Sequence, residues 1–191
     1  MKEDERIYVF IRHKIGLLDR DDSYSRAACA KLRRAVGKPP GMSPDIWDIT
    51  LQGAPEEWDN KKGEASYAEY AVHTALTLYA LHRQGKNNSM NAESIGFGFA
   101  IAQLIKKDSN RMEATRRRFN AVATANDLTE LAHHARGLIQ MLKADDIKMD
   151  YPLFSKELYS FQFSGIQNRI RLRWGEQFYK NIDNNEGMDK K

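Results

Sequence analysis

Hydrophobic residues recur every three or four positions through most of the chain, which is the spacing of one face of an α-helix. The clearest stretch spans residues 128–142, where the apolar face consists of Leu128, Leu131, Ala132, Ala135, Leu138, Ile139 and Leu142. Residues 3–18 repeat the pattern with Ile7, Phe10, Ile11, Ile15 and Leu18. We find no convincing strand pattern and no internal repeat. The pattern predicts an all-α fold.

Capping residues and prolines set the ends of the predicted helices. Ser66-Tyr-Ala-Glu69 has the form of a capping box, and so has Asp127-Leu-Thr-Glu130. The run at 37–41, Gly-Lys-Pro-Pro-Gly, ends a helix because proline lacks the N–H that the next turn needs. We expect eight to nine helices, drawn from the ranges 3–18, 25–36, 44–51, 66–84, 92–107, 109–125, 128–142, 150–163 and 165–179.

The last of these segments has two interpretations. Residues 169–174, Arg-Ile-Arg-Leu-Arg-Trp, alternate like a half-buried strand. The apolar positions that continue at helical spacing to Phe178 favour a helix, with Arg169 and Arg173 along the rim of its buried face and Arg171 pointing elsewhere.

The helices predict two lobes that meet near residues 106–110: an N-terminal helical lobe, 1–107, and a C-terminal helical bundle, 108–182. Residues 183–191 are polar and are expected to form a disordered tail. Residues 52–65 are polar as well and predict an exposed loop. Gly96 and Gly98 each weaken the helical pattern around them by about 1 kcal/mol, unless they allow close packing.

Composition indicates a soluble, cytoplasmic protein. Of the 191 residues, 41% are hydrophobic and 29% are charged, which is ordinary for a globular chain. Cys29 is the sole cysteine, so no internal disulfide can form. No apolar run approaches the roughly 18 residues of a membrane span, and the N-terminus does not lead into a signal-peptide core. The net charge of +4 is too small to indicate nucleic-acid binding by itself.

No pattern of residues indicates catalysis. The five histidines do not form a metal-binding motif, and His133 and His134 point about 100° apart on a helix. Cys29 lies among alanines, which predicts a buried thiol without a chemical role. The glycines at 96 and 98 lack the lysine and hydroxyl of a phosphate-binding loop. We predict a protein with no catalytic residue, no metal and no cofactor.

Basic residues cluster at three places. Five cations without an intervening acid lie on one stretch: Arg26, Lys31, Arg33, Arg34 and Lys38. Residues 116–118 are a run of three arginines, and the third cluster is Arg169, Arg171 and Arg173. Arginine donates a planar fork that matches phosphate, so rigid clusters could hold a nucleic-acid backbone. Equally, such faces can be solvated or can bind acidic protein partners.

Trp174 and Phe119 could stack on bases. Their positions on apolar stripes favour the core instead.

Several blocks of the chain together resemble a known family. In order, they are Ala30-Lys-Leu-Arg-Arg-Ala35 with Gly37-Lys-Pro-Pro; Leu78-Tyr-Ala-Leu-His82 with Ser94-Ile-Gly96; Arg117-Arg-Phe119; Leu131-Ala-His-His-Ala-Arg136; Asp150-Tyr-Pro-Leu153; and Arg169-Ile-Arg-Leu-Arg-Trp174 through Phe178-Tyr179. Over about residues 8–180 the chain resembles CasB, the small subunit of the type I-E CRISPR surveillance complex Cascade. Gly137 departs from the family, in which a second basic residue after Arg136 is expected.

The resemblance implies a two-lobed helical protein without enzymatic activity. Family members sit as a pair in Cascade, beside the large subunit and the backbone subunits. They stabilise the R-loop of guide RNA and target DNA, and the displaced strand, in antiviral defence. The nucleic-acid-binding candidates are Lys31, Arg33, Arg34, Lys38, Arg117, Arg118, Arg136, Arg169, Arg171 and Arg173. The alternative function is a helical scaffold whose basic faces bind acidic proteins.

Overall fold

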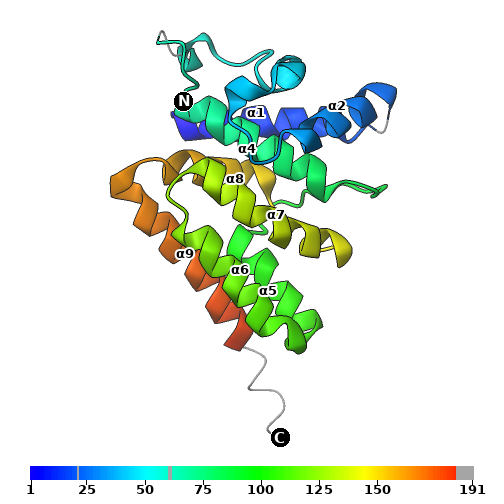
Figure 1. The fold of residues 1–191 in the computed structure, drawn as a ribbon, viewed down its shortest axis with the longest axis vertical. Helices are drawn as coiled ribbons and strands as arrows, with labels where there is room; N and C mark the ends of the chain where they lie inside the picture. The colour runs from blue at the N-terminus through cyan, green and yellow to red at the C-terminus, as the bar shows by residue number, and fades with distance from the viewer. Residues whose placement is uncertain (21, 60–61, 184–191) are drawn as a thin grey trace, which may run out of the picture.

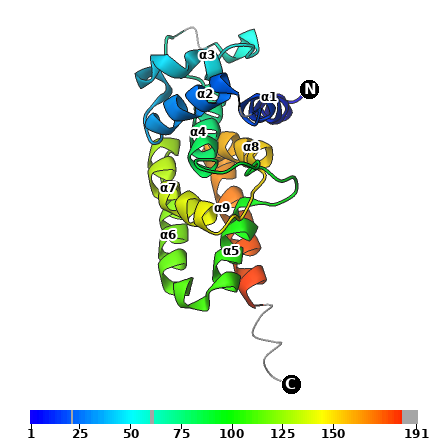
Figure 2. The same cartoon turned by 90° about the vertical axis from the view of Figure 1, so that its right-hand side faces the viewer.

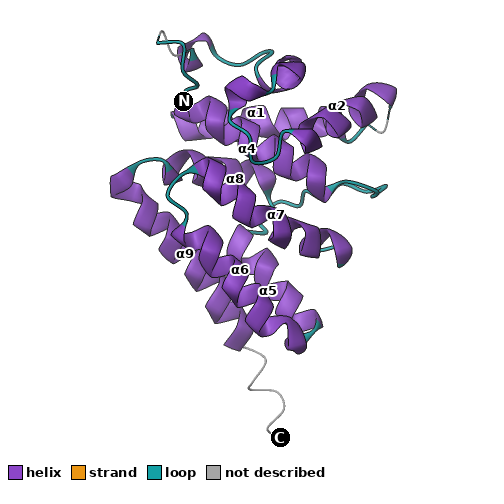
Figure 3. Ribbon diagram, viewed as in Figure 1, coloured by secondary structure: helices purple, strands orange, loops and turns teal. Residues whose placement is uncertain are grey.

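The computed structural model describes residues 1–20, 22–59 and 62–183, and within these ranges the chain forms nine α-helices and no strand beyond one isolated bridge. The helices are α1 (Glu3–Leu18), α2 (Ser23–Arg34), α3 (Trp47–Thr50), α4 (Tyr67–His82), α5 (Phe97–Lys107), α6 (Met112–Thr124), α7 (Leu128–Ala144), α8 (Tyr151–Phe161) and α9 (Ser164–Asp183). Figure 3 shows the resulting all-helical molecule, so the predicted fold class is confirmed. The predicted disordered tail lies outside the described residues from 184 onward.

The capping residues act at the predicted helix starts. At α4 the Ser66 hydroxyl accepts from the backbone N–H of Glu69 (3.2 Å), and the Glu69 carboxylate accepts from the N–H of Ser66 (2.6 Å). At α7 only half of the box forms. Asp127 caps the N–H of Glu130 (2.9 Å), whereas the Glu130 carboxylate accepts from the N–H of Asn126 (2.8 Å).

The predicted helix over residues 92–107 is wrong in its first turn, because α5 begins only at Phe97. The preceding residues bond to the segment before α8 instead. The N–H of Ser94 donates to the Asp150 carboxylate (2.8 Å), the N–H of Asp150 donates to the carbonyl of Ile95 (2.7 Å), and Ser94 adopts a positive φ of 65°. A helix over these residues would break those bonds.

The predicted exposed loop over residues 52–65 is wrong at Trp58. This side chain is 3% exposed and packs edge-on against Phe10 of α1, with ring centroids 5.2 Å apart. Its indole N–H donates to the Glu3 carboxylate, which anchors a 3-10 turn over residues 56–58 on the first helix.

The helices do not pack in chain order. α8 lies against α1 and α4 in the N-terminal half of the molecule, while α5 runs along α9 at the opposite end (Figure 1). α7 lies between them, against α4 on one side and α6 on the other, as the turned view in Figure 2 also shows. The proposed division into lobes at residue 107 stays a prediction, since one hydrophobic core runs through both halves.

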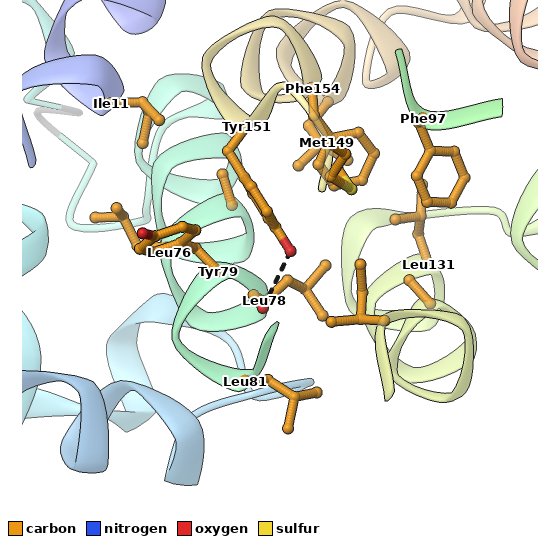
Figure 4. Close-up of a cluster of buried hydrophobic side chains, with 14 of the residues drawn as sticks. Ile11, Leu76, Leu78, Tyr79, Leu81, Phe97, Leu131, Met149, Tyr151 and Phe154 are labelled. Carbon is orange, nitrogen blue, oxygen red and sulfur yellow. Dashed lines mark hydrogen bonds between the residues drawn. The ribbon is translucent and has the colours of Figure 1, made fainter. Parts of the chain in front are cut away.

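The core is centred on the N-terminal end of α8. Tyr151 is fully buried there, and its hydroxyl donates to the carbonyl of Leu78 in α4 (3.3 Å; Figure 4). Met149 and Phe154 lie beside it, and Figure 4 shows them facing Phe97 of α5. Short contacts between α4, α5, α7 and α8 therefore tie the two halves together.

The final helix packs through the predicted apolar stripe. Ile170, Trp174 and Phe178 are all buried, which confirms the helical interpretation of residues 165–179. Phe119 stacks on Phe178 with ring centroids 4.4 Å apart, so Trp174 and Phe119 belong to the core and are not available to stack on bases. α5 approaches α9 so closely that a Cβ atom on Gly98 would lie 2.1 Å from the carbonyl oxygen of Trp174.

Candidate nucleic-acid interface

The cations of the first basic cluster, on α2 and in the turn after it, lie in different surroundings. Arg34 is exposed and pairs with Asp45 at 3.4 Å, a surface contact of little energetic weight. Lys38 is exposed, and Lys31 is half-buried. Arg33 is half-buried and lines a cavity with Arg83, at the C-terminal end of α4. These four cations therefore differ in exposure and in partners.

The side chain of Arg118 in α6 lies close to α7, next to Arg136. Arg117 and Arg136 are exposed. Arg118 donates to the carbonyl of Ala114 (3.2 Å), and its side chain lies over Gly137: a Cβ atom there would be 3.5 Å from the Arg118 Nε atom. The side chain of Arg118 thus occupies the surface next to Arg136 where the family resemblance predicts a second basic residue.

The three arginines of α9 differ in how firmly they are held. Arg169 is exposed. Arg171 donates to the carbonyl of Ala125 (2.8 Å) and lies over the ring of Phe161 at 5.4 Å. It therefore holds α9 against the connection between α6 and α7. Arg173 is half-exposed and pairs with Glu157 at 3.6 Å.

Glu157 is a buried carboxylate beneath Arg173. Its side chain is 2% exposed, and its second oxygen accepts a hydrogen bond from the indole N–H of Trp174 at 2.7 Å. Burial raises the pKa of Glu157 above its usual value, while the bonds from Trp174 and Arg173 act in the opposite direction. Sequence reasoning did not find this residue, because its partners lie 16 and 17 positions further along the chain.

A cavity of about 650 Å³ lies where segments next to the basic clusters meet. Its walls include Pro39, which follows Lys38, and Phe161, over which Arg171 packs. Asn126, at the end of the α6–α7 connection, also lines it. The cavity is thus lined by neighbours of two basic candidates, the residue after Lys38 and the ring over which Arg171 lies, but by neither cation itself. Arg33 lies toward the other end of α4, roughly 20 Å away by helical rise.

The described part of the chain contains no group of three or more His, Cys, Asp or Glu residues that could hold a metal ion. His73 and His82 are buried, and His134 pairs with Glu130 at 3.6 Å. Over the same residues, no helix combines the length and the apolar character needed to cross a membrane.

Residues 28–179 match the family model described as CRISPR-associated protein Cse2. The chain belongs to the Cse2 family. The matched segment contains each of the basic candidates, from Lys31 to Arg173. A comparison of this Cse2-family chain with curated proteins found no significant match.

Solved structures share the fold of this Cse2-family protein. CasB from Thermobifida fusca is 29% identical, with a TM-score of 0.76 over 91% of this chain and 98% of that chain. M. ruber CasB is 17% identical, with a TM-score of 0.63 over 96% and 98% of the two chains. A chain of a structure described as a CRISPR RNA-guided surveillance complex is 15% identical, with a TM-score of 0.71 over 98% and 99%.

Replacing Glu157 with glutamine should change the pH dependence of stability of this Cse2-family protein. Because the pKa of Glu157 is raised in the folded chain, its contribution to stability is full below the unfolded pKa, near 4.5, and is lost as the pH rises through the folded pKa. Glu157→Gln should therefore lose less stability than the wild type between pH 4.5 and pH 7, as measured by urea unfolding.

The matched control for that measurement is Glu176→Gln. Glu176 is exposed on α9 and pairs with Lys180, one turn further along α9, at 3.2 Å. It should retain the wild-type pH profile. Identical profiles for Glu157→Gln and the wild type would contradict the assignment.

Proposed function

We propose that this protein is the non-enzymatic small subunit of a type I-E Cascade complex, and that it holds nucleic-acid backbones in the R-loop through exposed arginines. The observation that carries the proposal is that Arg117, Arg136 and Arg169 are exposed on packed helices and form no ion pair with any described residue. Membership of the Cse2 family supports it.

A subunit of this kind can act by holding nucleic-acid strands in position, without catalysing a reaction. Each guanidinium presents several N–H donors in a plane, so it can grip a phosphate of any nucleotide without reading its base. Sequence is read by pairing between guide RNA and target DNA, and the protein contributes affinity for the paired and displaced strands. A rigid helical scaffold lowers the entropy cost of holding the arginines in place.

The proposed partners are guide RNA and target DNA, the large and backbone subunits of Cascade, and a second copy of the chain. The similarity of fold to a chain of an RNA-guided surveillance complex supports a place in such an assembly.

A protein-binding scaffold is the second candidate, and one observation favours it. Leu172 is 64% exposed on the outer face of α9, next to Arg173 and one turn from Arg169. Tyr179 is 42% exposed two turns further along the same face. Apolar residues bordered by arginines are common at protein interfaces, so part of α9 could bind a neighbouring subunit.

The double variant Arg117→Ala/Arg169→Ala should bind a mixed-sequence DNA duplex about 30-fold more weakly than the wild type at 0.15 M salt. Each lost phosphate contact should also reduce the slope of log affinity against log salt by about 0.9. The loss should be similar for unrelated sequences. Fluorescence anisotropy over a range of salt concentrations measures both quantities.

The control Arg34→Ala/Arg116→Ala removes the same charge from arginines that already pair with acids, at 3.4 Å and 2.5 Å. It should weaken binding much less. A flat salt dependence of the wild type, or equal losses in both variants, would refute the backbone-binding role and favour the scaffold.

A further inference from the structure

A basic cavity of about 330 Å³ lies between one face of α2 and the turn that follows α4. Its lining consists of Arg26, Cys29, Arg33, Arg83, Gln84, Gly85, Lys86 and Asn87. Four of these eight residues are cationic, and they come from α2 and from the turn that follows α4. Arg26, Cys29 and Arg33 lie on one face of α2, since they are separated by three and four positions.

Arg83 is the fixed part of this cavity. Its side chain is only 6% exposed, and its Nε atom donates to the Asp19 carboxylate at 2.8 Å. A second donor, Nη2, lies 3.5 Å from the carbonyl of Asp19. The hydroxyl of Tyr79 donates to the same Asp19 carboxylate, which holds the acceptor in place. A guanidinium has five N–H donors, so Arg83, which also bonds to the thiol of Cys29 and lines the cavity, keeps donors beyond those that Asp19 accepts.

The charges around the cavity do not cancel. Asp19 pairs with Arg83, and Asp146 pairs with Lys86 at 2.6 Å. These two acids offset Arg83 and Lys86, whereas Arg33 forms no ion pair with any described residue, so its charge leaves the cavity with a positive excess. The thiol of Cys29 does not reduce this positive charge. Burial raises the pKa of Cys29 and keeps the sulfur protonated at neutral pH, although the charges of Arg83 and Arg33 act on the pKa in the opposite direction.

We propose that this cavity binds one phosphate group, held by Arg83, Arg33 and Lys86. The assignment of that phosphate to a nucleic-acid strand rests on the proposed function. The cavity would then hold a backbone phosphate apart from the exposed arginines of α6, α7 and α9.

The lining residues select for phosphate among the chemical groups of a nucleic acid. None of the eight is aromatic, so the cavity offers no ring on which a base could stack. A phosphate oxygen pair matches the fork of a guanidinium and accepts from several donors at once. Arg83 is partly desolvated, and an ion pair in such surroundings is weakened less by salt than one on an open surface.

The thiol of Cys29 reports on occupancy of the cavity, because it lines the cavity and is the only cysteine in the chain. Inorganic phosphate at pH 7 should slow its reaction with a thiol reagent about tenfold, in a saturable manner, relative to sodium chloride at equal ionic strength. Arg33→Ala should abolish the protection. Arg34→Ala, the neighbouring arginine that pairs with Asp45 outside the cavity, should retain it.

A mixed-sequence single-stranded DNA in place of phosphate identifies the source of the group. Protection by both ligands supports a backbone phosphate. Protection by phosphate alone keeps the site but overturns its assignment to a nucleic-acid strand. Absence of protection by either at matched ionic strength overturns the site itself, even if the Arg117/Arg169 variant confirms nucleic-acid binding elsewhere. If Arg33→Ala does not fold, Lys86→Ala takes its place, and the wild-type titration already separates these outcomes.

Discussion

Replacing Gly98 with alanine is expected to lower the free energy of unfolding by about 3 kcal/mol or more. The new Cβ atom would lie 2.1 Å from the carbonyl oxygen of Trp174 and 2.9 Å from the Cβ atom of Gln177. The first of these neighbours is backbone, so it cannot rotate away. α5 and α9 would have to separate along their shared interface, which would open the packing of Phe97 on Trp174, now 5.2 Å apart between ring centroids.

Gly175→Ala is the matched control, because it makes the same chemical change in α9 at a site with no atom within 4 Å of the new Cβ. Alanine is a better helix former than glycine, so this variant should gain up to about 1 kcal/mol. Denaturant unfolding of the two variants measures the difference. A Gly98→Ala protein as stable as the wild type would show that α5 and α9 do not approach so closely.

Acidification is expected to remove about 3 kcal/mol of stability through His82 alone between pH 6.5 and pH 4. The side chain is fully buried, with its Nδ1 atom 3.0 Å from the hydroxyl of Tyr151. Burial is the main reason that its pKa falls to about 4, and the nearby cations Lys86 and Lys143 add to the effect. The unfolded chain takes up a proton near pH 6.5 and the folded chain only near pH 4, so stability decreases as the pH falls between these values.

His82→Phe should show a smaller loss of stability over the same pH range, since phenylalanine keeps a planar ring and removes the titrating group. The relevant quantity is the difference in unfolding free energy between pH 6.5 and pH 4 for each protein, so a change in stability at neutral pH does not affect the comparison. His133→Gln, at an exposed position of α7, is the control and should keep the wild-type difference. Equal losses in the wild type and His82→Phe would contradict the prediction.

Local sequence patterns predict the helices of this protein well, because their causes are local. The capping box of Ser66 and Glu69 and the apolar stripe of α7 each depend on residues a few positions apart. The ambiguous segment from Arg169 to Trp174 could be assigned because the stripe continues to Phe178. The basic candidates other than Lys38 were placed on helices for the same reason, although which of them touch nucleic acid stays a prediction.

Features that depend on distant residues could not be predicted from the pattern. The first turn of the helix expected at residue 92 is replaced by bonds to Asp150, more than 50 positions away. Trp58 looked exposed because its neighbours are polar, yet Phe10 covers it. Arg83 is buried because Asp19 lies beneath it, 64 positions earlier. Spacing also cannot show that Arg171 is bound to the carbonyl of Ala125 while Arg169 is exposed.

Helices made early in the chain pack against helices made late, and this has a consequence for synthesis on the ribosome. α1 and α4 bury apolar surface against α8, which is made about 70 residues after the end of α4, while α5 needs α9, the last helix. Although α1, α2 and α4 contact one another, neither half of the nascent chain can bury all of its own apolar surface, and the growing chain exposes apolar helices until nearly all of it has emerged. Truncated products would lack a stable core, so incomplete chains would be exposed to proteolysis before they could enter an assembly.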